Sequence, residues 1–164
     1  MTQTNIVMLV LAPLIMWRVY KRVQRLTVRQ KSRVWRHWIG AAAFPLILAG
    51  FALTLLGNPL ALAAIGGGVA LGVILGLVAL RRTGFESSGG EHFYTPYAPI
   101  GLLIAMLFIA RLLYRTYEYI AHGPAQMPAF GSSPLTMFIF ATVAGYYHIY
   151  STGLLRWRRA TISK

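Results

Sequence analysis

Apolar residues occur along the chain in five long runs, separated by short polar or glycine-containing segments. A transmembrane α-helix needs about 20 predominantly apolar residues to cross a bilayer, and runs of about this length are typical of such helices. The pattern therefore predicts an all-α, polytopic membrane helix bundle. Its five transmembrane helices are expected over about residues 6–19, 38–56, 59–80, 99–115 and 134–155. Residues 1–164 form a single integral membrane domain in this interpretation, because no segment between the runs is long enough to fold alone.

Two of the predicted helices begin with a recognisable start signal. Asn58-Pro59 and Ser133-Pro134 each place a capping side chain before a proline at the first helical position. Gly57-Asn58 is then a tight turn, so the second and third predicted helices form a hairpin. Pro13 and Pro45 lie inside the first and second predicted helices, where a proline removes a backbone hydrogen bond and favours a kink.

The cationic residues are sorted by membrane side. The chain is 57% hydrophobic and has only three acidic residues. Fourteen of its 16 Lys and Arg fall in alternate gaps between the apolar runs, at Arg18–Arg36, Arg81-Arg82 and Arg156–Lys164. Cationic loops remain cytoplasmic during membrane insertion. We therefore expect a multi-pass protein of the bacterial inner (cytoplasmic) membrane, with its N-terminus outside and its C-terminus in the cytoplasm.

The formal net charge of +13 lies next to the predicted helices and not on a separable domain. This arrangement favours anionic lipid headgroups as partners and argues against nucleic acid. Six arginines between the first two predicted helices follow helical spacing, and they lie within an arc of about 80° if residues 18–36 form one helix. Such a helix would lie along the inner headgroups and bind anionic lipid, whereas the alternative is that its arginines only fix orientation. The six are Arg18, Arg22, Arg25, Arg29, Arg33 and Arg36.

Glycines recur every four residues in the third predicted helix, at Gly68, Gly72 and Gly76. Small residues on one helix face let two backbones approach closely, so this stripe predicts a helix-packing surface. We expect it to pack against another helix of the same chain, and self-association of two copies through this helix is the alternative.

Arg111 and Arg115 are the two exceptions to the sorting of charge, because they lie within and at the end of the fourth apolar run. A charged side chain inside a membrane costs about 2.5–3.5 kcal/mol on insertion scales, so it needs a partner or water. With Glu118 and His122 the two arginines follow spacings of 4, 3 and 4, which places all four on one polar stripe of a helix.

The stripe Arg111, Arg115, Glu118 and His122 is a candidate intramembrane binding site for an anion or a lipid phosphate. The alternative is a structural arginine that extends toward the outer surface. Expected partners of Arg111 are Thr142 and Tyr146, and the backbone carbonyls that Pro45 or Pro13 leaves free.

Histidines offer a further hypothesis, which is haem binding. His148 lies in the last predicted helix near the inner surface, and bis-histidine ligation would need His37 or His92 as the second ligand. A hydrogen-bonded histidine at the interface is the simpler interpretation. The sequence therefore predicts no cofactor, with haem as the one alternative.

Enzymatic chemistry has little support in the sequence. Glu86, Glu91 and His92 share the inner loop, but no metal-binding spacing is present and pairing with nearby arginines is the simpler interpretation. No serine has the context of a catalytic nucleophile. The chain has no cysteine, so it has no thiol for disulfide chemistry or metal binding.

Three short motifs follow one another in a distinctive order: Arg-Thr-Gly-Phe-Glu at 82–86, Ile-Ala-Arg-Leu-Leu-Tyr-Arg at 109–115, and Leu-Leu-Arg-Trp-Arg-Arg at 154–159. In this order, after a glycine-rich third helix, the chain resembles the CcdC-like family of small membrane proteins. The resemblance implies a link to cytochrome c maturation. The positions that it carries over are Arg82, Thr83, Phe85, Glu86, Arg111 and Arg115.

Together these features predict a non-enzymatic accessory or assembly protein that binds partner helices and anionic lipid. A small transporter, or a protein that handles lipid or anions through Arg111, is the first alternative. A haem-binding membrane protein is the second.

Overall fold

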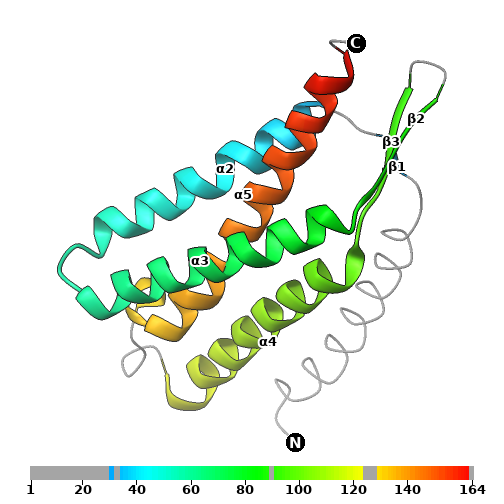
Figure 1. Ribbon diagram of the computed structural model, residues 1–164. Coiled ribbons are helices and arrows are strands. Elements are labelled where there is room, and N and C mark those ends of the chain that lie inside the picture. The colour runs from blue at the N-terminus through cyan, green and yellow to red at the C-terminus, as the bar shows by residue number, and fades with distance from the viewer. Residues whose placement is uncertain (1–29, 32–33, 89–90, 124–128, 163–164) are drawn as a thin grey trace, which may run out of the picture.

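A computed structural model describes residues 30–31, 34–88, 91–123 and 129–162 (Figure 1). Within these ranges the chain is mainly helical. The elements in chain order are β1 (Gln30–Lys31), α2 (Val34–Thr54), α3 (Pro59–Arg81), β2 (Gly84–Ser88), β3 (Glu91–Thr95), α4 (Ala98–His122), the 3-10 turn η2 (Phe130–Ser132) and α5 (Pro134–Ile162). The helix predicted over residues 6–19, and Arg18, Arg22, Arg25, Arg29 and Arg33, lie outside the described residues.

The predicted start of α3 is confirmed in detail. The Asn58 side chain accepts a hydrogen bond from the backbone N–H of Ala61 at 3.1 Å, and Pro59 occupies the first helical position. The bounds of the other helices differ from the prediction. α2 begins four residues earlier and ends two residues earlier than expected, whereas helical structure in α4 and α5 continues past the apolar runs. α4 extends to His122 and stops at Gly123, whose φ of 78° is a conformation that favours glycine. α5 extends to Ile162.

α5 is the central helix and packs most closely against α3. The three glycines of α3 are buried. A Cβ atom would collide with the α5 backbone at Gly68, beside Phe138, and at Gly72, beside Thr142, and would be tight at Gly76, beside Tyr146. The residue numbers of the contacting pairs increase together along both helices, so α3 and α5 run parallel. The glycine stripe is therefore an intramolecular packing surface, and a second copy cannot use it while α5 occupies it.

α2 and α4 pack antiparallel to α5. On α2, the Phe44 ring stacks on Tyr147 at 5.2 Å, and the Phe51 ring meets Phe140 edge-on at 5.5 Å. On α4, Gly101 lies against the Tyr146 hydroxyl. Adjacent helices along the chain thus alternate in direction, with α5 behind and between the others in Figure 1.

Large apolar side chains remain on the outside of the bundle. α3 and α4 are each long and apolar enough to cross a membrane, and residues Trp38–Thr54 of α2 form a shorter apolar helix. Only 11% of the apolar stretch of α4 is buried, with Leu103 and Leu107 more than half exposed. Water does not stabilise an apolar face of this size, so the bundle has the surface of a membrane-associated protein.

The segment between α3 and α4 forms a β-hairpin, which the all-α prediction did not include. β2 pairs antiparallel with β3, in a register that runs from Gly84↔Thr95 to Ser88↔Glu91. β1 adds to the other edge of β3, in the order β1-β3-β2.

This third strand corrects the prediction of one cationic helix over residues 18–36. Gln30 pairs with Tyr94 and Lys31 with Phe93, so the backbone at 30–31 is extended. Its N–H and C=O groups pair with the open edge of the hairpin instead of continuing a helix. Arg36 therefore belongs to α2 and cannot share one helical arc with arginines before residue 30.

Candidate functional site

Arg111 and Arg115, the two arginines associated with the fourth apolar run, donate to the same hydroxyl group. Arg111 donates from Nε to Thr136 Oγ1 at 3.1 Å and from Nη2 to Ser133 Oγ at 3.1 Å. Arg115 donates from Nη1 to the same Thr136 oxygen at 3.3 Å. Thr136 is fully buried and Arg115 is 9% exposed, so the cluster lies between α4 and α5.

The chain directions of α4 and α5 account for this meeting. The two helices are antiparallel, so the second half of α4 lies beside the first turn of α5, which begins at Pro134. The predicted partners Thr142 and Tyr146 lie farther along α5 and are engaged elsewhere. Thr142 donates to the Phe138 carbonyl at 2.8 Å, and the Tyr146 ring stacks on Tyr150.

The hydrogen-bond partners of Arg111 are neutral. Within the described part of the chain its guanidinium donates to hydroxyl oxygens, and its positive charge also lies 5.4 Å from the centre of the Tyr114 ring. The Arg115 guanidinium lies 5.5 Å from the Phe130 ring centre. Hydroxyl and aromatic groups stabilise a cation without neutralising it, so these contacts leave the charge of Arg111 in place.

Glu118 and His122 lie apart from this cluster. His122 is exposed, and its Nδ1 lies 3.3 Å from the backbone carbonyl of Glu118 on the same helix. Glu118 is half-buried. The polar stripe predicted from spacing is present on α4, and Arg111 and Arg115 are the members for which hydrogen bonds to α5 are seen among the described residues.

A second polar contact joins α2 and α5. Pro45 has no N–H, so the carbonyl of Ala41, four residues earlier, has no intrahelical donor. His148 Nδ1 lies 2.8 Å from this carbonyl. Because a carbonyl only accepts, Nδ1 is the protonated nitrogen of His148 in this contact. The carbonyl that Pro45 frees is thus satisfied by His148 and not, as predicted, by Arg111.

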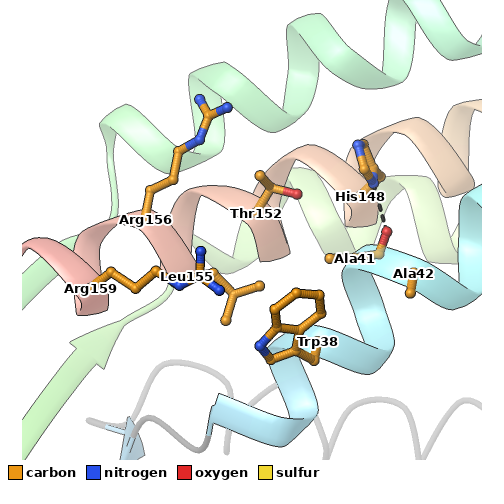
Figure 2. A pocket seen from close by; sticks show the side chains of 8 residues that line it. All are labelled: Trp38, Ala41, Ala42, His148, Thr152, Leu155, Arg156 and Arg159. Atoms are coloured by element: carbon orange, nitrogen blue, oxygen red, sulfur yellow. Dashed lines mark hydrogen bonds between the residues drawn. The ribbon is translucent and has the colours of Figure 1, made fainter.

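A cavity of about 300 Å³ lies beside this contact, between α2 and α5 (Figure 2). His148, Thr152, Arg156 and Arg159 of α5 line one side, and Trp38 of α2 lines the other. The Arg159 guanidinium lies 5.5 Å from the Trp38 ring centre. No sequence signal for this cavity was recognised, although the α5 residues follow helical spacing.

The Arg-Thr-Gly-Phe-Glu stretch connects the hairpin to the bundle. Arg82 donates to the Tyr97 hydroxyl at 3.4 Å. The buried Thr83 hydroxyl donates to the Ala79 carbonyl at 2.9 Å and lies 3.0 Å from the Tyr150 hydroxyl, which therefore donates to it.

The two remaining residues of the stretch lie on the hairpin. Phe85 packs on Trp157 of α5, with ring centres 4.7 Å apart. Glu86 lies opposite Phe93 in the strand register. Positions 82–85 thus have a structural role, which is to attach the hairpin to α4 and α5.

Neither a haem pair nor a metal cluster is assembled by the described side chains. The side chains of His37, Glu91 and His92 lie outside the description. Among the rest, no three His, Asp or Glu side chains are grouped as metal ligands.

The Pro45–His148 relation predicts an energetic coupling. His148→Phe should destabilise the protein by about 1–3 kcal/mol, because it leaves the Ala41 carbonyl unpaired. In a Pro45→Ala background the cost should largely vanish, since residue 45 regains the N–H that pairs with Ala41. Unfolding free energies in detergent measure both values, with His122→Phe as a control expected within about 0.5 kcal/mol of wild type. An equal cost in the two backgrounds would contradict the assignment.

Comparison with known proteins identifies the family. No curated protein and no solved structure matches the chain. A family model described as CcdC protein matches residues 1–164, which is the whole chain and includes the three motifs that carried the resemblance. The chain therefore belongs to the CcdC protein family.

Proposed function

We propose that this protein is a non-enzymatic, multi-pass accessory protein of the bacterial inner membrane, which assists assembly by binding partner helices and anionic lipid. The observation that carries the proposal is the outer face of α4. Its apolar stretch is only 11% buried within the bundle, and Leu103 and Leu107 are among its exposed side chains. In a bilayer this face meets either lipid chains or the helices of another protein.

Five membrane-spanning helices with an outer N-terminus are part of the proposal. The alternating directions of α2 to α5 support it, because consecutive spans must reverse direction. The separation of cations also supports it, since Arg81, Arg82 and Arg156 lie at the inner ends of their helices while the Gly57-Asn58 turn has no charge.

Single cysteines test this topology without a background, because the chain has none. Gly57→Cys, in the exposed turn before α3, should react with a membrane-impermeant maleimide in intact cells. Glu86→Cys, on the exposed hairpin, should react only after the membrane is permeabilised. The reverse labelling pattern, or labelling of both variants from outside, would contradict the proposed orientation.

The family description specifies no reaction. The resemblance to CcdC-like proteins implies a link to cytochrome c maturation. This chain has no cysteine, so its contribution would be to bind or position another protein that carries the chemistry.

Photocrosslinking in native membranes tests the partner-binding face. A diazirine analogue of leucine at Leu107, which is 53% exposed, should give discrete adducts with a second protein. The same analogue at Leu154, which is 2% exposed, should crosslink only within the chain. Mass spectrometry identifies the adducts, and membership of the cytochrome c maturation machinery would support the link. If Leu103 and Leu107 give only lipid adducts, partner binding through α4 is wrong.

A second candidate function is anion handling at the arginine cluster of α4 and α5. The neutral hydrogen-bond partners of Arg111 favour it, because an anion would balance the charge of its guanidinium. By contrast, the satisfied Ala41 carbonyl accounts for His148 without haem.

Phosphate titration tests anion handling. If Arg111 and its neighbours bind inorganic phosphate, a concentration of about 100 times Kd stabilises the protein by about 2.7 kcal/mol. Arg111→Leu should abolish this stabilisation, whereas His122→Leu, on the same helix but exposed, should retain it. Thermal unfolding in detergent is the measurement. Equal stabilisation of the two variants would indicate only the general effect of phosphate on folded proteins.

A further inference from the structure

We propose that the cavity between α2 and α5 binds the phosphate headgroup of an acidic phospholipid. This inference rests on the proposed membrane location and identifies one site for the anionic lipid. The cavity is distinct from the arginine cluster, because His148 and Arg159 lie in the second half of α5 whereas Ser133 and Thr136 lie at its start.

The α5 wall of the cavity changes from polar and neutral to cationic along its length. His148, Thr152, Arg156 and Arg159 lie on one face of the helix, at spacings of four, four and three residues. The distance from His148 to Arg159 along the axis is about 16 Å at 1.5 Å per residue. The two arginines are exposed and occupy the end that faces the cytoplasm in the proposed topology. A headgroup at this depth of the inner leaflet would meet them directly.

The opposite wall is apolar and has room for the start of a lipid chain. Trp38, Ala41 and Ala42 of α2 face Leu155 of α5 across the cavity. The alanines have small side chains and leave the space open, while Trp38 is 52% exposed. A tryptophan at the boundary between headgroups and chains is typical of membrane proteins. A volume of about 300 Å³ is enough for a headgroup, and the rest of the lipid would remain in the bilayer.

Arg159 is the side chain that we expect to contact the phosphate. Figure 2 shows it extending toward Trp38, and its guanidinium lies 5.5 Å from that ring centre. Arg156 extends in the other direction (Figure 2). No acidic residue is among the described residues that line the cavity. A guanidinium held on an aromatic face keeps its N–H edge available for a phosphate oxygen.

Fluorescence quenching in a variant with Trp38 as its single tryptophan tests the proposal. Phenylalanine replaces Trp17, Trp35 and Trp157 in the full chain, and brominated phosphatidylglycerol or brominated phosphatidylcholine is added in mixed micelles. Brominated phosphatidylglycerol should quench Trp38 fluorescence at a lower concentration than brominated phosphatidylcholine does. Arg159→Gln should raise that concentration about fivefold, which corresponds to about 1 kcal/mol for one cation near a lipid surface. Arg159→Lys, which retains the charge, should restore most of the preference.

Arg81→Gln is the matched control, because Arg81 is an exposed cation at the inner end of α3 and does not line the cavity. It should leave the half-quenching concentration unchanged. Size-exclusion profiles and helical circular dichroism establish that each variant is folded.

An equal loss of lipid preference in Arg81→Gln and Arg159→Gln, or no preference for phosphatidylglycerol in the parent, overturns the site. Displacement of the lipid by an equal concentration of inorganic phosphate overturns it in favour of a soluble anion. These outcomes leave the cysteine-labelling result unaffected, so failure of the site is distinguishable from failure of the membrane assignment.

Discussion

The close contact between α3 and α5 determines where the candidate side chains lie. Three buried glycines at intervals of one helical turn bring the α3 backbone against α5, and at Gly68 and Gly72 a Cβ atom would collide with the α5 backbone. The parallel alignment then fixes the position of α5 along the bundle. Its first turn lies beside the arginines of α4, and its second half lies beside Pro45 and Trp38 of α2. Without this contact, neither the arginine cluster nor the cavity would be assembled.

Several polar groups inside the bundle are satisfied by hydrogen bonds between helices. A membrane interior offers no water to a free carbonyl or a charged side chain, so each such group requires a partner from the protein. His148 satisfies the Ala41 carbonyl, Thr136 accepts from two arginines, and Tyr150 donates to Thr83. In each pair one member is on α5, which is therefore the polar as well as the apolar centre of the fold. Arg111 differs from the other groups, because hydroxyl oxygens accept from its N–H groups but leave its charge.

Local signals in the sequence predicted much of the helical framework. Asn58-Pro59 starts α3 as expected, since capping and a proline at the first position depend on adjacent residues only. The glycine interval predicted a packing face but not its partner, and Pro45 predicted a free carbonyl but not the donor that satisfies it. His148 is 107 residues away from Ala41 along the chain, and no local pattern relates the two. The hairpin has a local signal in the sequence, Gly89-Gly90 between segments rich in aromatic and polar residues, but glycine and serine clusters are equally typical of an irregular loop.

The position of α5 in the chain affects how this bundle assembles. α2 and α3, joined by a short turn, can enter the membrane as a helical pair as soon as both have been synthesised. Three groups have their partners on α5, which is synthesised after them: the glycine face of α3, the Ala41 carbonyl and Arg111. During that interval their final partners do not yet exist, and lipid, water or another protein must occupy these surfaces. A chain interrupted before residue 134 would retain its apolar helices and lose the element that joins them.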